Sequence, residues 1–416
     1  MAKKYLVILM SKNIIKSIKD TYNHFFSKEP INQELISKNV LAIINTLQAN
    51  NFEAYIVGGA IRDILISLTP KDFDIATNAK PEEIRHLFKN SRIIGRRFRL
   101  VHIFFGRELI EVSTFRAKPE KVERLKNGIL KDNEYGTKEE DAVRRDFTCN
   151  ALYFDPKRNK IFDFFNGIED LKNRHLNMIG NAKIRLAEDP VRAIRAIRFS
   201  AKLGFEIDNK LKQQIIQVLP ELKKIPYSRL FDEILKIFLT GYAENSFKLV
   251  NDFNLAKIFF PSLQSGSKET ISFIKRGLKK TDERIFLGKP INPGYLIAVF
   301  LWKDVKILQD NLAKKTKYPL TALNDAIEIT LNKQNKIFPI QKRFITTMTE
   351  IWQLQPRFEN LNKKRVFRLF AHPRFRAAYD FMLLRGEENE VNEQIISWWI
   401  NFVESTDEER KALITN

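Results

Sequence analysis

Apolar residues recur along the chain with two different periods, and the change between them divides the sequence into two parts. Near the start, helical spacing relates Val40, Ile43, Ile44 and Leu47, and Asn50 ends that helix. Between residues 54 and 165, short apolar runs bounded by polar or turn residues predict strands mixed with helices. The predicted strands are Tyr55–Val57, Phe73–Ala76, Leu100–Phe105, Leu109–Thr114, Thr148–Tyr153 and Ile161–Phe164, and the predicted helices are Arg62–Leu68 and Pro81–Asn90.

Beyond Gly167 the strand pattern fades, and helical periodicity continues to the end of the sequence. Clear amphipathic segments are Val191–Leu203, Arg229–Leu239 and Ile395–Val403. We therefore expect an α+β protein in which a small domain of mixed sheet and helices precedes a long all-helical region. A stretch rich in Lys and Glu, 117–133, predicts a loop, and the basic residues 1–35 lack a clean period and form an N-terminal extension of doubtful order.

The net charge of +21 adds a prediction about partners, because such an excess of Lys and Arg favours a polyanion. A nucleic acid or an anionic membrane surface would fit, and basic side chains that merely face solvent are the structural alternative. No apolar run approaches the roughly 20 residues of a membrane span, so we expect no membrane association and a cytoplasmic location. The single cysteine, Cys149, excludes an internal disulfide and fits a reducing compartment.

Two carboxylates placed two residues apart, Asp72 and Asp74, carry the clearest chemistry in the sequence. In a strand both would project from one face, and Phe73 between them would turn into the core. Paired anions repel each other, but carboxylates together with substrate phosphates are the ligands that Mg²⁺ prefers. Upstream, Gly58 and Gly59 follow an apolar strand and open a helix, where backbone amides can approach a triphosphate. This segment predicts a metal-dependent nucleotide site.

Glu111 is the candidate for a third metal ligand. It alternates with Ile110 and Val112 in a strand-like run and would therefore face away from both. If its strand lies beside that of Asp72 and Asp74, three carboxylates converge. That is the ligand set with which two Mg²⁺ ions activate a 3′-hydroxyl and stabilise a departing pyrophosphate. The alternative is a solvent-facing residue on an amphipathic strand.

Two further pairs of charges have both a binding and a structural interpretation. Arg62 could meet phosphates while Asp63 orients it, or the two residues could form an ordinary ion pair on a helix surface. Arg145 could hold a ribose or phosphate through its planar fork of donors. Asp146 could orient that arginine or join the acidic cluster, and a solvated helix end is the alternative for both residues.

The helix predicted after Asp189 carries a row of arginines. Asp189 followed by Pro190 is a typical helix start. Within the helix, Arg192, Arg195 and Arg198 recur at a spacing of three beside an apolar row. One face would pack and another would present three guanidinium groups, which suit phosphates and base edges. Asp189 beside Arg192 could pair with a nucleobase.

Together these segments resemble the class II nucleotidyltransferases of the polymerase-β-like superfamily, which include the tRNA CCA-adding enzymes and the bacterial poly(A) polymerases. The motifs that carry the resemblance are Gly58-Gly59-Ala60-Ile61-Arg62-Asp63, Asp72-Phe73-Asp74, Arg144-Arg145-Asp146 and Glu188-Asp189-Pro190-Val191-Arg192. Their order and spacing are specific, although each motif alone is weak. Marks that favour the poly(A) polymerase I branch include Glu111-Val112-Ser113-Thr114-Phe115-Arg116, Ile351-Trp352-Gln353-Leu354-Gln355 and His372-Pro373-Arg374-Phe375-Arg376.

The resemblance implies a head or palm domain on a five-stranded sheet over 36–166, a helical neck over 167–225 and an RNA-binding helical body and leg over 226–416. The implied catalytic acids are Asp72, Asp74, Glu111 and Asp146, the first three as ligands of two Mg²⁺ ions, which Mn²⁺ could replace. Whether Glu111 or Asp146 is the third essential acid stays open. Nucleotide recognition falls on Arg145, Asp189 and Arg192, with Arg195 and Arg198 lining the same pocket, and Gly58, Gly59 and Arg62 complete the expected nucleotide site.

The implied function is template-independent addition of AMP from ATP to RNA 3′ ends, both of mRNA and of structured RNA fragments, which promotes RNA decay in bacteria. Addition of CCA to tRNA, within the same superfamily, is the second hypothesis. A catalytically inactive RNA-binding protein that keeps the fold is the third. We expect a monomer, with RNA-decay machinery or an Sm-like chaperone as protein partners.

Overall fold

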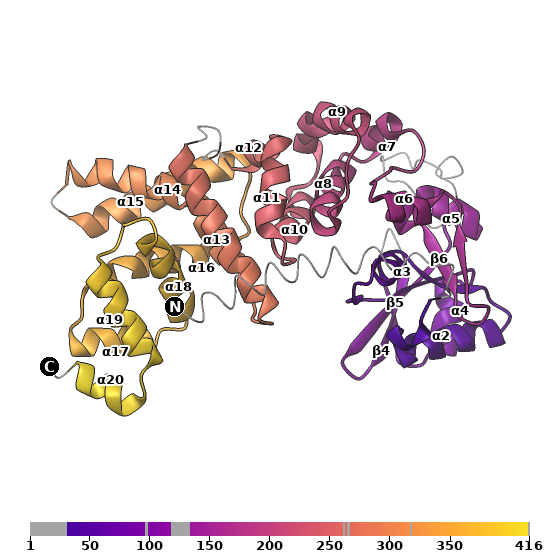
Figure 1. Cartoon of the computed structure of the whole chain (residues 1–416), viewed down its shortest axis with the longest axis horizontal. Coiled ribbons are helices and arrows are strands. Elements are labelled where there is room, and N and C mark those ends of the chain that lie inside the picture. The colour runs from indigo at the N-terminus through magenta and orange to yellow at the C-terminus, as the bar shows by residue number, and fades with distance from the viewer. Residues whose placement is uncertain are drawn as a thin grey trace. The chain divides into compact units, whose positions relative to one another are not determined.

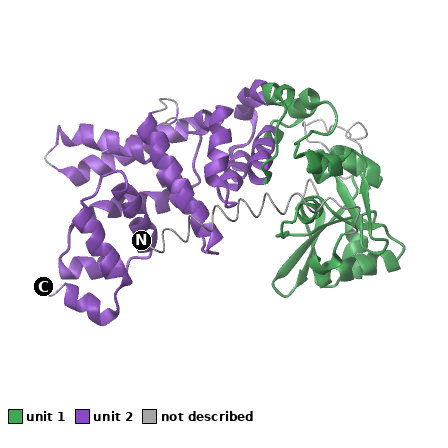
Figure 2. Cartoon of the chain, in the orientation of Figure 1, with its two compact units in different colours: residues 1–192, 203–214 green, residues 193–202, 215–416 purple. Residues whose placement is uncertain are grey.

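The chain folds into two compact units, which the computed structural model shows in Figures 1 and 2. Of the described residues, those up to 192 and over 203–214 belong to unit 1, and those over 193–202 and beyond 214 belong to unit 2. The predicted boundary at residue 225 stays a prediction. The residues described by the structure are 31–95, 99–117, 134–260, 263, 267–316 and 318–414. Most of the predicted N-terminal extension and nearly all of the predicted loop over 117–133 lie outside the described residues.

Unit 1 is built on one mixed sheet, in the strand order β3-β4-β5-β2-β1-β6-β7. The strands are β1 (Ala54–Val57), β2 (Asp74–Thr77), β3 (Ser91–Ile94), β4 (Leu100–Phe105), β5 (Glu108–Thr114), β6 (Leu152–Asp155) and β7 (Lys160–Asp163). β2 and β5 are parallel, and the other neighbours are antiparallel. The expectation of five strands was wrong, because β3 extends one edge beyond β4 and β7 extends the other beyond β6.

Helices flank this sheet and lead out of it (Figure 1). They are α2 (Lys38–Ala49), α3 (Gly59–Leu65), α4 (Pro81–Leu87), α5 (Lys138–Arg144), α6 (Gly167–Asn173) and α7 (Ala182–Glu188), with 3₁₀ turns at η1 (Gln33–Leu35) and η3 (Thr148–Asn150). Helix α2 buries the apolar residues predicted for its inner face and ends at Ala49, with Asn50 as its C-cap. That element of the sequence analysis is confirmed.

Two predicted elements of unit 1 begin several residues from the expected position, for local reasons. The helix predicted from Arg62 begins at Gly59, because Gly58 adopts a φ of +73° and turns the chain directly from β1 into α3. The strand predicted from Thr148 begins at Leu152. The residues before it form a 3₁₀ turn, in which the Asn150 amide donates to the Phe147 carbonyl at 2.9 Å.

Unit 2 is built from helices, as the periodicity of the second half predicted. They include parts of α8 (Val191–Leu203) and α9 (Asn209–Val218), then η4 (Leu219–Lys224), α10 (Tyr227–Phe238), α11 (Ala243–Asp252), α12 (Ala256–Phe259), α13 (Lys268–Phe286), α14 (Pro293–Ala313), α15 (Pro319–Ile337), α16 (Lys342–Leu354), η6 (Gln355–Glu359), α17 (Lys363–Phe370), α18 (Phe375–Gly386), α19 (Glu393–Glu404) and α20 (Asp407–Leu413). Large buried side chains such as Trp302, Trp352 and Trp399 fill its interior. Among the described residues, no helix is both long and apolar enough to cross a bilayer. The expected α+β class is confirmed.

Candidate active site

The turn between β1 and α3 places two glycines against two arginines. Gly58 has a φ of +73°, which L side chains rarely adopt, and a Cβ on it would lie 3.2 Å from Arg145 Nη1. Gly59 begins α3, and a Cβ there would lie 3.4 Å from Arg62 Nη2. The space that the sequence predicts for a phosphate is thus bordered by two guanidinium groups.

Strands β2 and β5 bring two of the predicted metal ligands into register. Their parallel pairing sets Asp74 opposite Glu111. Both side chains are exposed, whereas the apolar neighbours of Glu111 along β5 are buried. This is the strand pairing on which the predicted convergence of carboxylates depended. Asp72 lies in the segment before β2 instead of within the strand, and Phe73 is half-buried rather than in the core.

The carboxylate of Asp74 lies in an unfavourable electrostatic environment. Loss of hydration raises its pKa, and the negative charge of Glu111 raises it further. Arg145 lowers the pKa and Asp72 raises it, and the net pKa is about 6. A divalent cation would relieve the repulsion among these carboxylates, so the donor set suits Mg²⁺.

As the side chains stand, the carboxylates do not surround a common point. Within the described part of the chain, no three acidic, His or Cys side chains are grouped as ligands of one ion. Glu111 is engaged by His102 of β4, with 3.2 Å between His102 Nε2 and Glu111 Oε1. His102 could not be predicted from the sequence, because its place opposite Glu111 follows from the β4–β5 register.

Arg145 is held by side chains from α5 and β6. Its Nε donates to the Tyr153 hydroxyl at 2.9 Å, and its Nη2 donates to Asp141 Oδ2 at 3.3 Å. The guanidinium lies 5.0 Å from the centre of the Tyr153 ring, and the Tyr153 hydroxyl donates to Asp141 Oδ2 at 2.5 Å. Arg145 was predicted from the sequence, but its partners Asp141 and Tyr153 were not. The spacing of four between Asp141 and Arg145 was the signal available for one of them.

Arg62 and Asp146 are joined in the interior of unit 1. Arg62 is 3% exposed, and it donates to Asp63 Oδ1 at 2.8 Å through Nε and to Asn150 Oδ1 at 2.5 Å through Nη1. Asn150 Nδ2 in turn donates to Asp146 Oδ1 at 3.0 Å. The predicted pair of Arg62 and Asp63 therefore exists, but it is buried rather than on a helix surface. Asn150, which links it to Asp146, was not named from the sequence.

Arg185 is a second residue that the sequence analysis did not name. Its buried guanidinium donates through Nη2 to the carbonyls of Val143, Arg144 and Arg145, at 3.3, 2.9 and 2.8 Å. Its Nη1 lies 3.0 Å from Glu188 Oε2. One side chain from α7 thus fixes the backbone that carries the Arg-Arg-Asp motif.

Two further candidates for nucleotide recognition in unit 1, Asp189 and Arg192, lie where α7 meets α8. Asp189 Oδ1 accepts a hydrogen bond from the Val191 amide at 3.3 Å, which agrees with its predicted role at the helix start. Arg192 Nη1 donates to the Arg185 carbonyl at 2.7 Å and lies 3.1 Å from Glu188 Oε2. Arg192 is therefore tied to the same arginine that holds the Arg-Arg-Asp backbone.

Arg195 and Arg198 belong to unit 2 and share a buried carboxylate there. Glu233 of α10 lies 3.9 Å from Arg195 Nη1 and 3.5 Å from Arg198 Nε. Both guanidinium groups also lie over the Phe199 ring, at 5.4 and 4.5 Å. Helix α8 buries its apolar row as predicted. The role of this pair of arginines in binding a nucleotide stays a prediction.

Comparisons with known proteins test the resemblance. Family models match along most of the chain: the Poly A polymerase head domain over residues 54–177, the probable RNA and SrmB-binding site of polymerase A over 204–266, and the polymerase A arginine-rich C-terminus over 315–416. Poly(A) polymerase I of Escherichia coli O6:H1 is 38% identical over 92% of this chain and 86% of its own length. The Haemophilus influenzae protein of the same name is 38% identical over 97% and 90%.

Relatives of a second kind are also found. A CCA-adding enzyme of Lactobacillus helveticus is 36% identical over 52% of this chain and 54% of its own length. Among solved structures, the Thermotoga maritima CCA-adding enzyme complexed with tRNA has a TM-score of 0.57 at 19% identity, covering 93% of this chain and 86% of that one. A CCA-adding enzyme in complex with ATP has a TM-score of 0.58 at 19% identity, covering 90% and 86%.

The solved structures show the fold, which this chain shares with the CCA-adding enzymes. The curated relatives show to which family the sequence belongs. The match to Poly(A) polymerase I extends over more than nine-tenths of the chain, whereas the match to the Lactobacillus helveticus enzyme extends over about half. The chain belongs to the bacterial poly(A) polymerase family, as the motifs implied.

Proposed function

We propose that this protein transfers AMP from ATP to RNA 3′ ends without a template, as a polynucleotide adenylyltransferase. The observation that carries the proposal is the register of Asp74 and Glu111 on parallel strands, in a chain of the poly(A) polymerase family. The raised pKa of Asp74 supports it, because loss of hydration and the charge of Glu111 both disfavour the ionised carboxylate, and a cation that also binds a triphosphate would offset both effects.

Asp72, Asp74 and Glu111 are the residues that would hold two Mg²⁺ ions, or Mn²⁺ in their place. The ions supply activation of the 3′-hydroxyl and neutralisation of the departing pyrophosphate. Asp146 supports this site through its hydrogen bond with Asn150. Comparing Glu111→Gln with Asp146→Asn in the same assay decides which of the two acids is essential.

Nucleotide recognition rests in this proposal on side chains that present planar donors at fixed positions. Arg145 is held by its hydrogen bonds to Tyr153, Asn150 and Asp141, so its guanidinium group is already ordered before a nucleotide binds. The full proposed set is Gly58, Gly59, Arg62, Arg145, Asp189, Arg192, Arg195 and Arg198.

The test is primer extension with purified protein, Mg²⁺, a generic RNA and each nucleoside triphosphate in turn. We expect repeated incorporation from ATP and little from the other three, and no extension by Asp72→Asn. The CCA-adding relatives make CCA addition the second candidate. Ordered addition of two C and one A to a tRNA that lacks its last three nucleotides would overturn the proposal in its favour. If the protein extends no RNA, the third hypothesis, a catalytically inactive RNA-binding protein that keeps the fold, would be favoured.

We further propose that the enzyme acts in the cytoplasm as a monomer on mRNA and structured RNA fragments, with RNA-decay machinery or an Sm-like chaperone as protein partners. Light scattering of the purified chain tests the monomer, and a dimer mass at working concentration would contradict it.

A further inference from the structure

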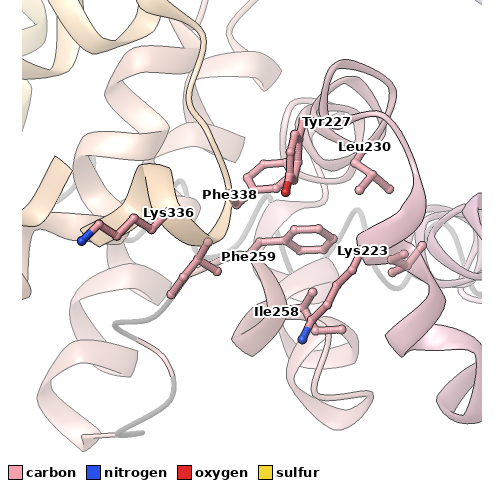
Figure 3. A pocket seen from close by; sticks show the side chains of 9 residues that line it. Lys223, Tyr227, Leu230, Ile258, Phe259, Lys336 and Phe338 are labelled. Carbon is pink, nitrogen blue, oxygen red and sulfur yellow. The ribbon is translucent and has the colours of Figure 1, made fainter. Parts of the chain in front are cut away.

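Unit 2 contains a cavity lined by aromatic rings and lysines (Figure 3). None of its lining residues belongs to the candidate active site. Its volume is about 280 Å³. Its lining comes from η4, the start of α10, the end of α12 and the end of α15, so segments distant in sequence build one concave site.

Three aromatic side chains form the wall of this cavity. Phe259 and Phe338 pack edge to face with 4.9 Å between ring centres, and Tyr227 meets Phe338 edge-on at 5.8 Å. The two phenylalanines are buried, whereas Tyr227 is 45% exposed. The tyrosine ring is therefore the part of the cluster that a flat ligand can reach.

The wall is fixed from the interior by one amide. Gln334 is 1% exposed, and its Nε2 donates to the carbonyls of Phe259 and Phe338 at 2.8 and 2.9 Å. This side chain ties the end of α12 to the end of α15. A cavity held in this way needs little further ordering when a ligand enters.

Two lysines flank the aromatic rings. Lys223 of η4 and Lys336 of α15 lie on opposite sides of the aromatic rings, and the ammonium group of Lys336 is turned away from them (Figure 3). Neither has a carboxylate partner among the described residues, whereas the neighbouring Lys224 pairs with Glu221 at 2.6 Å. The rim therefore carries positive charge that the described fold leaves uncompensated.

We propose that this cavity receives one nucleobase of the RNA substrate against Tyr227, with Lys223 and Lys336 on the phosphates on either side of that base. The volume falls just below the roughly 300–1,000 Å³ of sites for small molecules, so it suits a single base. Stacking and phosphate contact accept any sequence, as an enzyme acting on many RNA ends requires. The inference rests on the proposed function, because it takes RNA as the substrate. An apolar peptide of a partner protein is the competing occupant, and the uncompensated lysines favour the polyanion.

The first test measures binding of the full chain to a labelled single-stranded oligoadenylate by fluorescence anisotropy, without ATP. We expect Tyr227→Ala to weaken binding about 5- to 50-fold, and Tyr227→Phe to keep most of the affinity because the ring remains. Tyr318→Ala is the matched control, since Tyr318 is also exposed and lies outside the cavity. Equal affinity of Tyr227→Ala and wild-type protein would overturn the proposal.

The second test uses the lysines and does not depend on the stability of a tyrosine variant. Lys223→Ala and Lys336→Ala should each lower the slope of log affinity against log salt by about 0.7. Lys275→Ala, at an exposed site on α13, should leave the slope unchanged. If both variants have the same slope as the wild-type protein, the lysines do not contact RNA phosphates and the proposal fails. An apolar peptide of a partner protein would then be the favoured occupant of the cavity.

A third measurement separates this inference from the proposed function. RNA that contains 4-thiouridine should crosslink to a peptide containing Tyr227 on irradiation, as mass spectrometry can show. If the wild-type protein extends RNA with ATP but crosslinks elsewhere and tolerates Tyr227→Ala, the cavity proposal fails and the function stands. If the wild-type protein extends no RNA, the function itself fails.

Discussion

Asp74 has a pKa of about 6, well above its ordinary value of 3.8, and this has a consequence for stability. Between those values the folded protein binds more protons than the unfolded chain, so its stability falls as the pH rises through this window. Above pH 6 the ionised carboxylate therefore destabilises the fold, in the absence of a cation. Asp74 is therefore needed for the proposed metal site but lowers the stability of the fold when no cation is bound.

A substitution of Asp74 tests this statement about stability. Without divalent ions and above pH 6, Asp74→Asn should raise the free energy of unfolding by on the order of 1 kcal/mol, after a reduction for the solvent exposure of the side chain. Thermal unfolding in a chelator across a pH series measures the difference, which should vanish at acidic pH. Asp325→Asn, at an exposed site on α15, should change nothing. A variant less stable than wild type above pH 6 would contradict the argument.

The same carboxylate should shape the dependence of activity on pH. Protonation of Asp74 below a pH of about 6 removes a metal ligand, so wild-type activity should fall on the acid side. Because Mg²⁺ competes with the proton, raising its concentration should move this acid limb to lower pH. Primer extension at several pH values and two Mg²⁺ concentrations provides the measurement. An acid limb that ignores the concentration of Mg²⁺ would exclude a metal ligand as its origin.

At the scale of residues, functional side chains that follow a local sequence pattern could be predicted, whereas those defined by tertiary contacts could not. Glu111 follows from alternation within its own strand, and Asp74 from its spacing of two from Asp72 in the sequence. Tyr153, Asn150 and Arg185 do not, because their contacts join segments that come together after folding. The missed residues mostly hold others in place, and a supporting role leaves no pattern in a single sequence.

At the scale of elements, the turn from β1 into α3 depends on Gly58. Gly58→Ala should destabilise unit 1 by about 1–3 kcal/mol through its backbone conformation, and the added Cβ would press on Arg145 at 3.2 Å. Activity should fall as well, because Arg145 must shift. Gly204→Ala is the matched control, since its φ of +67° is also strained but open space surrounds it. Thermal unfolding should show similar losses of stability in Gly58→Ala and Gly204→Ala. Primer extension should show a loss of activity in Gly58→Ala alone.

The connection between α7 and the Arg-Arg-Asp motif gives a second prediction at this scale. Arg185→Ala removes the donors to three carbonyls, and we expect a loss of about 2–4 kcal/mol in stability and a raised KM for ATP. Arg185→Lys should recover little, because an ammonium lacks the planar fork. Lys183→Ala, on an exposed face of the same helix, is the control. An unchanged KM for ATP in Arg185→Ala would show that the motif needs no support from α7.

Elements with a strong period were predictable, and those fixed by tertiary contacts were not. Helices α2, α8 and α10 follow from their buried faces. Strand β3 was missed because it is short, half-exposed and at the edge of the sheet, so it has no alternating pattern. The 3₁₀ turn η3 has the same run of buried residues that a short strand would have, so the sequence pattern predicts a strand there.

At the scale of the whole molecule, the sequence predicted a mixed sheet followed by helices but not how the two units divide. By contacts, the middle of α8 belongs to unit 2 while its ends belong to unit 1. The proposed recognition residues on this helix are thus supported by different units, with Arg192 tied to α7 and Arg195 and Arg198 tied to Glu233. A change of hydrophobic period along the chain cannot reveal that one helix is divided between two units, because the period reports local burial alone.

The charge of the whole chain gives the last prediction. Lys and Arg outnumber Asp and Glu by 71 to 50, and we expect much of this excess to meet RNA phosphates. If about five phosphates are contacted, a fourfold rise in salt should weaken RNA binding by about 100-fold, through the release of counterions. The KM for ATP should change far less. Anisotropy over a salt series measures the slope, and an oligomer of the same bases on an uncharged backbone is the control. A slope near zero would mean that the basic side chains serve solubility, and that affinity for RNA comes from stacking instead.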